Sequence, residues 1–554
     1  MKSRSTTRIA IGALLLTVLA AVIIAAGCAN TFTSSGASEQ TTLTGTTLRN
    51  TGPTQSFFTA VQVDPRSEDS AGPQVVVAGD LDGDGLLDLV SGWNQSQPLQ
   101  IHLQRRDERN NITFETVTLA GNIPIALIAD LAVADFDSDG HNDIAVLVKD
   151  TGDTGLCRMT GQPVSGSTGA IVIYYGPADA RDVTNPLAWV DVQLMNSFVQ
   201  GSAGASGSEA VLPEDGGYTA VAVGDLDGVN GPDMVVTFNA GGCDGNLREV
   251  DAYYNPGSAG ARRSGEWTPT PLFQGIPGDP NAITIKDVAL ADIDRDGDLD
   301  VLTTIPGANA RNVSWFRNPQ LDAPDDFHIS DGEWHMGVIG QISSGADVLA
   351  VGDIDQDGIV DVAIRSTTGL LIQWLKGAQF PTTEPVRSIP WHVFTLAEFR
   401  DRAPEALALG DVSDDGRIDA VVSAGGAIVW FNGRSAANVY DPWAENLIVD
   451  ENPGGGTASA ASIPSPPPTN GNSANANGSA PTTQPASGGT TTGPTSGSAG
   501  SGSVATLINA LLIVDLDGDG DRDIIATLDR RQGSGLTNDA LIWYRNDLRA
   551  LAAP

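Results

Sequence analysis

The sequence predicts an all-β protein, a seven-bladed β-propeller built from four-stranded blades. Three observations predict this fold. An acidic motif recurs seven times between short apolar runs, and two further strand-like elements follow the copies in a fixed order. The runs are short and rich in Val and Ile, and Gly, Asp and Asn separate them, which is typical of strands and turns rather than helices.

Each copy of the acidic motif joins two apolar runs, as in VVVAGDLDGDGLLDLV from Val75. Successive copies begin 55 to 104 residues apart, a spacing that indicates a repeated supersecondary unit carrying insertions. We number the nine-residue loops by their first aspartate: Asp80 (loop 1), Asp135 (loop 2), Asp225 (loop 3), Asp292 (loop 4), Asp353 (loop 5), Asp411 (loop 6) and Asp515 (loop 7).

The fourth strand of each unit predicts how the ring closes. After most copies an aromatic residue is followed at +3 and +5 by mostly apolar residues, but the chain after Tyr544 contains no such strand. The missing copy lies near the N-terminus, at Phe58–Val63. We therefore expect Phe58–Val63 to pair with the strand that ends in Trp543 and Tyr544. The closed ring would remove exposed strand edges.

The loops follow the pattern D-x-D-x-D-G-x-x-D, which brings carboxylates from alternate positions to one centre around a sharp glycine turn. Hard oxygen ligands in this arrangement predict calcium, and the strand flanks together with Asp at position 9 argue against a helix–loop–helix hand. The alternative is a set of polar turns capped by Asp. Five loops are complete: Asp80, Asp82, Asp84 and Asp88; Asp135, Asp137, Asp139 and Asp143; Asp292, Asp294, Asp296 and Asp300; Asp353, Asp355, Asp357 and Asp361; Asp515, Asp517, Asp519 and Asp523.

Two loops are incomplete. In loop 6, Ser413 replaces one aspartate, and the predicted ligands are Asp411, Ser413, Asp415 and Asp419. In loop 3, Val229 occupies position 5, and the sequence leaves open whether Asp225, Asp227 and Asp233 bind metal. We expect about five to six calcium sites per chain. Because clustered carboxylates repel one another without a cation, we expect calcium to hold the blades together.

The loops and the aromatic strands resemble the FG-GAP/VCBS repeat family, which is related to the propeller of integrin alpha subunits. The resemblance covers roughly residues 57–545. It implies calcium-binding loops that brace the blades, and a role in adhesion or recognition.

The N-terminus predicts export. Residues 1–28 combine basic residues, an apolar run and Ala25-Ala26-Gly27-Cys28, which resembles a bacterial lipobox with Cys28 as the lipidated residue. The alternative is that residues 9–27 remain as a membrane anchor. Residues 29–54 are expected to form a flexible tether. Both alternatives predict a protein of the cell envelope, periplasmic or at the cell surface.

Residues 55–554 form the predicted propeller, with a disordered insertion at 452–503 composed mostly of Gly, Ser, Thr, Pro, Asn and Ala. If Cys28 is lipidated, Cys157 and Cys243 are the two remaining cysteines. They follow equivalent strands of neighbouring blades, which predicts a disulfide in an oxidising compartment.

The net charge of −38 argues against a nucleic-acid partner. We expect a monomeric binding or scaffold module without catalytic chemistry, whose ligand is a protein or a glycan. The alternative is a polysaccharide-active lyase or hydrolase, or a lectin, on the same fold. The sequence names neither the ligand nor the face that binds it.

Overall fold

The computed structural model of the chain describes the propeller strands and most of their turns. The described residues are 57–64, 72–93, 99–123, 125, 127–150, 155–156, 163–164, 168–198, 217–239, 248–263, 266–267, 269–274, 285–304, 313–319, 334–340, 342, 345–366, 370–378, 391–399, 402–433, 439–451, 506–530 and 539–549.

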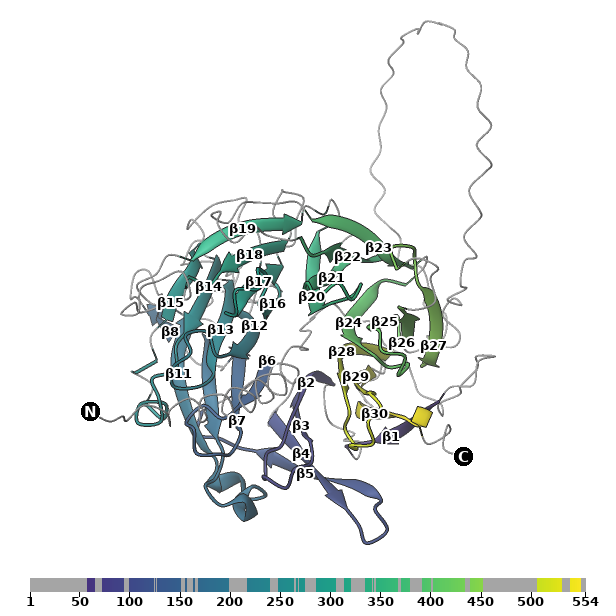
Figure 1. Cartoon of the computed structure of the whole chain (residues 1–554). Coiled ribbons are helices and arrows are strands. Elements are labelled where there is room, and N and C mark those ends of the chain that lie inside the picture. Colours follow the sequence, from purple (N-terminus) through teal and green to yellow (C-terminus); the bar gives the residue numbers. More distant parts are fainter. Residues whose placement is uncertain are drawn as a thin grey trace, which may run out of the picture.

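Seven four-stranded antiparallel sheets surround a central axis, as predicted (Figure 1). Strands follow in chain order across each blade, except that the fourth strand of blade 7 is the N-terminal β1. Blade 1 is β2 (Pro73–Gly79), β3 (Asp88–Trp93), β4 (Leu99–Arg106) and β5 (Ile112–Leu119); blade 2 is β6 (Leu127–Ala134), β7 (Asp143–Asp150), β10 (Thr168–Tyr175) and β11 (Val190–Phe198); blade 3 is β12 (Gly217–Gly224), β13 (Asp233–Asn239), β14 (Arg248–Tyr253) and β15 (Pro269–Gln274).

The remaining blades repeat this order, and a two-stranded sheet of β8 (Gly155–Leu156) and β9 (Pro163–Val164) is inserted in blade 2. Blade 4 is β16 (Val288–Ala291), β17 (Asp300–Thr304), β18 (Val313–Arg317) and β19 (His335–Gly340); blade 5 is β20 (Ala346–Gly352), β21 (Asp361–Ser366), β22 (Leu371–Lys376) and β23 (His392–Glu398); blade 6 is β24 (Pro404–Gly410), β25 (Asp419–Ala424), β26 (Ala427–Asn432) and β27 (Ala444–Asp450); blade 7 is β28 (Thr506–Val514), β29 (Asp523–Arg530), β30 (Ala540–Asn546) and β1 (Phe58–Gln62).

The ring closes through the N-terminal strand, which confirms the prediction. Strand β1 pairs antiparallel with β30, from Phe58 opposite Asn546 to Gln62 opposite Ile542. The Val63 N–H extends the ladder by donating to the Leu541 carbonyl at 3.0 Å. The first and last strands of the propeller therefore share one sheet, and blade 7 depends on both ends of the chain.

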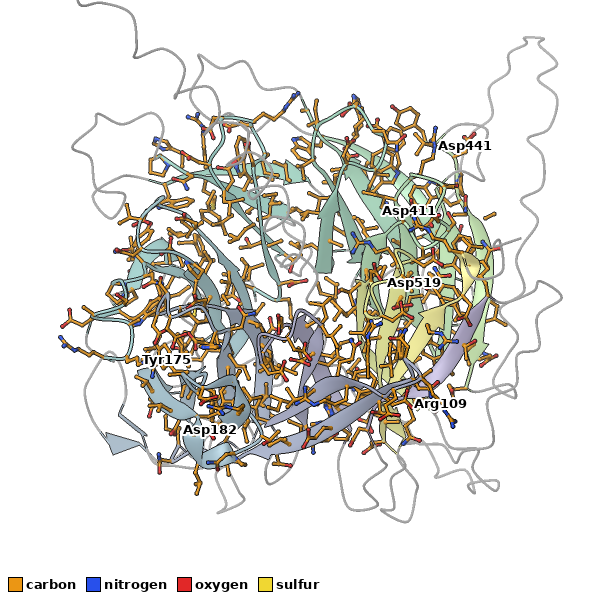
Figure 2. The ribbon with its side chains drawn as sticks, turned by 60° about the horizontal axis from the view of Figure 1, so that its bottom comes forward. Arg109, Tyr175, Asp182, Asp411, Asp441 and Asp519 are labelled. Carbon is orange, nitrogen blue, oxygen red and sulfur yellow. The ribbon has the colours of Figure 1, made fainter. Side chains whose placement is uncertain are left out.

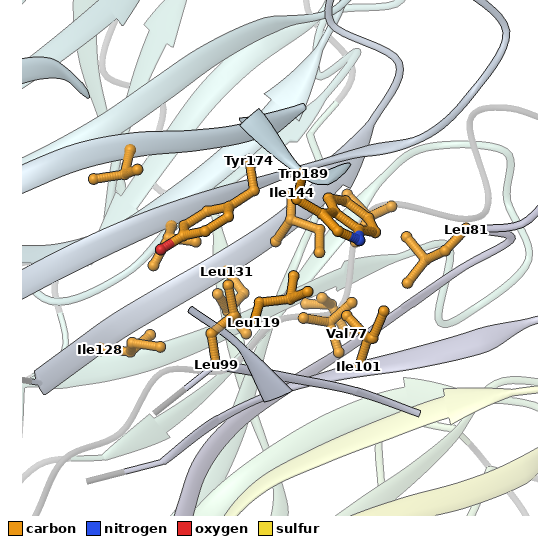
Figure 3. Packing of buried hydrophobic residues seen from close by; sticks show 14 of the residues in the cluster. Val77, Leu81, Leu99, Ile101, Leu119, Ile128, Leu131, Ile144, Tyr174 and Trp189 are labelled. Atoms are coloured by element: carbon orange, nitrogen blue, oxygen red, sulfur yellow. The ribbon is translucent and has the colours of Figure 1, made fainter. Parts of the chain in front are cut away.

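Neighbouring blades pack face to face. Between blades 1 and 2, Val77 and Ile101 lie in one cluster with Leu131, Ile144 and Trp189, all of them buried (Figure 3). Both faces of a second strand such as β21 are covered, so all six of its residues are buried. This explains why these strands are nearly continuous apolar runs rather than alternating ones.

Buried acidic side chains on the inner strands join neighbouring blades. One Asp130 carboxylate oxygen accepts from the Leu131 N–H and the other from the Val221 N–H of blade 3, both at 2.9 Å. Glu405 of blade 6 accepts from the Ile508 N–H of blade 7 in the same way, at 3.2 Å. Burial raises the pKa of Asp130 and of Glu405 to about 7. The blades are therefore joined by polar contacts as well as by apolar packing.

Several predictions concern segments outside the described residues. These are the signal or anchor at 1–28 with Cys28, the tether at 29–54, the insertion at 452–503 and the disulfide between Cys157 and Cys243. Within the part of the chain that the structure describes, no helix has the length and apolar character needed to cross a membrane.

Candidate metal centres

Each acidic loop connects the first and second strands of its blade. Because all blades share one strand order, all seven loops lie on one face of the ring. Figure 2 labels Asp411 of loop 6 and Asp519 of loop 7, and Arg549 joins these two loops by pairing with Asp414 and Asp521. Contacts between loops agree with this view, since the Gln356 amide of loop 5 donates to the Gly416 carbonyl of loop 6.

The backbone of every loop makes the same turn. Position 4 is left-handed in all seven loops, although four of them carry a residue other than glycine there, for example Gln356 with φ 62° and Arg295 with φ 65°. Position 6 is also left-handed, with glycine in every loop except loop 3, where Asn230 has φ 67°. Glycine adopts this conformation without a steric cost, which explains its place in the motif.

The aspartate at position 1 organises this turn. In loop 5 one Asp353 oxygen accepts from the Asp357 N–H at 3.0 Å, and the other accepts from the Gly358 N–H at 2.9 Å. At position 5, Asp357 accepts from the Ile359 N–H at 3.0 Å. These bonds satisfy the donors of the turn and hold both carboxylates in fixed orientations.

The aspartate at position 9 ties the loop to the rest of its blade. One Asp361 oxygen accepts from the Ile354 N–H of the loop at 2.9 Å, and the other accepts from the Gly377 N–H after the third strand at 2.6 Å. Burial raises the pKa of Asp361 to about 7. The same pair of bonds recurs in every loop, at Asp88, Asp143, Asp233, Asp300, Asp361, Asp419 and Asp523.

The aspartate at position 3 carries the strongest indication of a missing ligand. The Asp355 side chain is 5% exposed, yet its Oδ1 atom is buried without a hydrogen-bond partner. A buried polar atom without a partner is costly unless something absent from the protein chain fills that role. The same orphaned atom recurs as Oδ1 of Asp82, Asp137 and Asp294.

Several loops bring enough carboxylates together to hold a metal ion. One oxygen from each of three or more acidic residues lies within 4.8 Å of the others in six groups of the described residues, among them Asp80, Asp82 and Asp88; Asp135, Asp137 and Asp143; Asp225, Asp227 and Asp233; Asp292, Asp294 and Asp300; Asp353, Asp355 and Asp357. Loop 3 is one of them, although Val229 has replaced the carboxylate at position 5 and is 51% exposed.

Basic side chains contact the position 3 and position 5 carboxylates of four complete loops, and these contacts were not predicted from the sequence. In loop 4, Arg317 contacts Asp294 and lies 3.1 Å from Asp296, and in loop 5, Lys376 contacts both Asp355 and Asp357. Arg105 and Arg262 make the corresponding contacts in loops 1 and 2. The signal in the sequence was the basic residue that ends the third strand of blades 4 and 5, Arg317 and Lys376.

Amide side chains connect four of the loops to the neighbouring blade. These contacts were not predicted from the sequence. Asn318 of blade 4 donates to the Leu226 carbonyl of loop 3 at 2.9 Å. Asn255 donates to the Phe136 carbonyl of loop 2 at 2.8 Å. Equivalent bonds run from Gln104 to Leu516 and from Asn546 to Val412. The loops are thus part of the interface between blades.

A comparison with known families agrees with this geometry. Residues 80–146 match the model of the FG-GAP-like repeat. The predicted resemblance is confirmed for this segment, which spans loops 1 and 2. No curated protein matches the sequence.

Two solved structures are similar to this propeller over much of its length. BBS1N in complex with ARL6DN is 12% identical and covers 89% of this chain and 98% of that chain, with a TM-score of 0.40. A lectin of Agrocybe aegerita, described as recognising non-reducing terminal N-acetylglucosamine, is 12% identical and covers 69% of this chain and 81% of that chain, with a TM-score of 0.37.

Proposed function

We propose that the chain is an exported, membrane-anchored propeller whose acidic loops bind calcium and which acts as a binding, adhesion or scaffold module. The observation that carries the metal site is the orphaned, buried Oδ1 atom at position 3, which recurs in four complete loops. Each of these aspartates belongs to a cluster of three carboxylates in the same loop.

Calcium is the ion that the donor set fits best. All proposed ligands are carboxylate, hydroxyl or backbone carbonyl oxygens, which suit a hard cation, and each complete loop contributes four carboxylates. Loops 1, 2, 4, 5 and 7 would hold one ion each, and loop 6 would use Ser413 in place of an aspartate. The bound ion would supply positive charge where the carboxylates of a loop otherwise repel one another.

Export is consistent with this choice of ion. Outside the cytoplasm, calcium sites with dissociation constants of ~10⁻⁴–10⁻³ M are commonly occupied. The N-terminal residues 1–28 supply the proposed signal, and Cys28 the proposed lipid attachment, with residues 9–27 as the alternative anchor. The propeller would then lie on the outer side of a membrane, joined to it by residues 29–54.

Binding rather than catalysis is proposed because the position 9 carboxylates and His102, two kinds of group that could serve in catalysis, are committed to the fold. At position 9 both carboxylate oxygens are bonded to the backbone. His102 is fully buried between Ser91 and Thr116, and burial lowers its pKa to about 3, so it is neutral at physiological pH. By contrast the Asp357 side chain is 36% exposed, so the loop face can be reached by a protein or glycan ligand.

Two measurements test this proposal. Equilibrium dialysis of the purified protein against calcium should give about five to six bound ions per chain, and failure to bind any would refute the metal assignment. Glycan and protein arrays probed with the calcium-loaded protein should then show a ligand. Turnover of a polysaccharide by the same preparation would favour the enzyme alternative instead.

A further inference from the structure

We propose that a basic side chain at loops 1, 2, 4 and 5 is a positioning residue for calcium, holding the outer oxygens of the position 3 and position 5 carboxylates so that the position 3 inner oxygen faces the ion. This inference rests on the proposed binding of calcium. We call these residues the outer cations: Arg105, Arg262, Arg317 and Lys376.

The contacts of the outer cations are divided between the two oxygens of one carboxylate. Lys376 contacts Oδ2 of Asp355, while Oδ1 of the same aspartate is the buried atom without a partner. Arg317 contacts Oδ2 of Asp294, and again Oδ1 is the orphan. Each position 3 carboxylate is therefore held on one side and open on the other, as expected when a second group orients a metal ligand.

The incomplete loops lack a cation at the same register. We call the register position the residue directly before the one whose N–H donates to the position 9 aspartate. In blades 4 and 5 the register position holds Arg317 and Lys376. In blades 3 and 6 the equivalent residues are the neutral Tyr254 and Asn432. These are the blades in which Val229 and Ser413 have replaced an acidic residue. In blades 1 and 2 this position is also neutral, with Leu103 and Tyr175, and the basic side chain comes from another position of the chain.

Loop 2 obtains its outer cation from elsewhere in the chain. Tyr175 occupies the register position of blade 2, and Arg262 of blade 3 lies over its ring at 5.1 Å from the centroid. From there Arg262 contacts Asp137 and lies 3.1 Å from Asp139. In loop 1 the cation is Arg105, two residues after the register position. Three different origins in the sequence thus deliver a positive charge to the same two carboxylates, which indicates a shared requirement of the site.

An outer cation can change the calcium affinity of its loop in two opposite ways. By Coulomb's law alone, a positive charge beside a calcium site weakens binding, so its removal should tighten binding. If the cation positions the ligands, its removal should weaken binding, and outer-shell changes of this kind typically cost about 10–100-fold in affinity. The direction of the change in affinity therefore distinguishes positioning from simple competition for the carboxylates.

The test is a calcium isotherm of the full chain by equilibrium dialysis, on a variant combining Arg105→Met, Arg317→Met and Lys376→Met. We expect the half-saturating calcium concentration of the altered sites to rise by roughly tenfold. A charge-preserving variant, with Arg105→Lys, Arg317→Lys and Lys376→Arg, should stay close to wild type. Arg109→Met is the control, since it removes a positive charge from the β4–β5 turn rather than from a loop pair (Figure 2).

An unchanged or lower half-saturating concentration in the Met variant would overturn the inference while leaving calcium binding itself intact. A wild-type protein that binds no calcium would instead refute the proposed function. If the triple variant does not fold, Lys376→Met alone tests the same point, because the half-saturating calcium concentration of the loop 5 site should rise.

Discussion

Loops 3 and 5 have the same framework but different side chains around it. In both, the position 9 aspartate accepts from the backbone on each oxygen: Asp361 from Ile354 and Gly377, and Asp233 from Leu226 and Asn255. In both, position 4 is left-handed. Loop 3 nevertheless lacks the carboxylate at position 5, and a tyrosine stands at the register position that Lys376 occupies in blade 5.

This comparison separates the turn from its metal ligands. Positions 1 and 9 and the left-handed residue build the turn with hydrogen bonds inside the protein. Positions 3 and 5 and the outer cation determine how many carboxylate oxygens face the centre and how they are held. A loop that lost calcium could keep its fold, because Asp225 and Asp233 still bond the backbone of loop 3.

The largest effect on the melting temperature is expected from a change of pH in the presence of a chelator, because the position 9 aspartates of all seven loops contribute. Burial raises the pKa of Asp361 to about 7 and that of Asp233 to about 8, from an ordinary value of 3.8. A pKa raised on folding gives stability that is present at acid pH and is lost as pH rises through about 7 to 8. The melting temperature of the chelated protein should therefore fall between pH ~5.5 and pH ~8.5. A rise over that range would contradict this assignment.

The next largest effect on stability should come from removing the position 9 aspartate, which accepts two backbone hydrogen bonds in every loop. Asp361→Ala and Asp233→Ala each leave two buried N–H groups unsatisfied, which costs roughly 2–6 kcal/mol. With chelator present, thermal unfolding should show similar losses for the two variants. Calcium should widen the gap between wild type and Asp361→Ala but not the gap for Asp233→Ala. Equal behaviour in calcium would mean that the two loops do not differ in metal binding.

A smaller effect is expected when calcium ligands alone are removed from loop 5. Asp353→Ala combined with Asp355→Ala should reduce the calcium-induced rise in stability by at most the contribution of one site, ~2.7 kcal/mol at a hundredfold excess over Kd. The effect should persist in part, because the other complete loops remain. The matched control, Asp227→Ala in loop 3, should change the calcium dependence less, as differential scanning calorimetry with and without calcium can show.

The smallest effect is expected from repairing loop 3. Val229→Asp combined with Asn230→Gly restores the full pattern and should add about one calcium ion per chain in equilibrium dialysis. Blade 3 has Tyr254 in place of an outer cation, so we expect this new site to be weaker than the others. A repaired loop as tight as loop 5 would show that the outer cation is dispensable.

The sequence predicted the features that recur at fixed spacing. The strand order, the seven loops and the closure of the ring by Phe58–Val63 all follow from the register of the repeats and are confirmed. Contacts between blades were not predicted, because they depend on which residues become neighbours around the ring. Arg262, for example, lies 125 residues from Asp137 along the chain, and no repeat places it there.

The central claim is that calcium in the loops holds the blades together, and the melting temperature of the wild-type protein tests it most directly. We predict that calcium raises the melting temperature, that a chelator lowers it, and that added calcium restores it, because binding to the folded state alone shifts the unfolding equilibrium. A melting temperature that responds to neither calcium nor chelator would show that the acidic loops are ordinary turns.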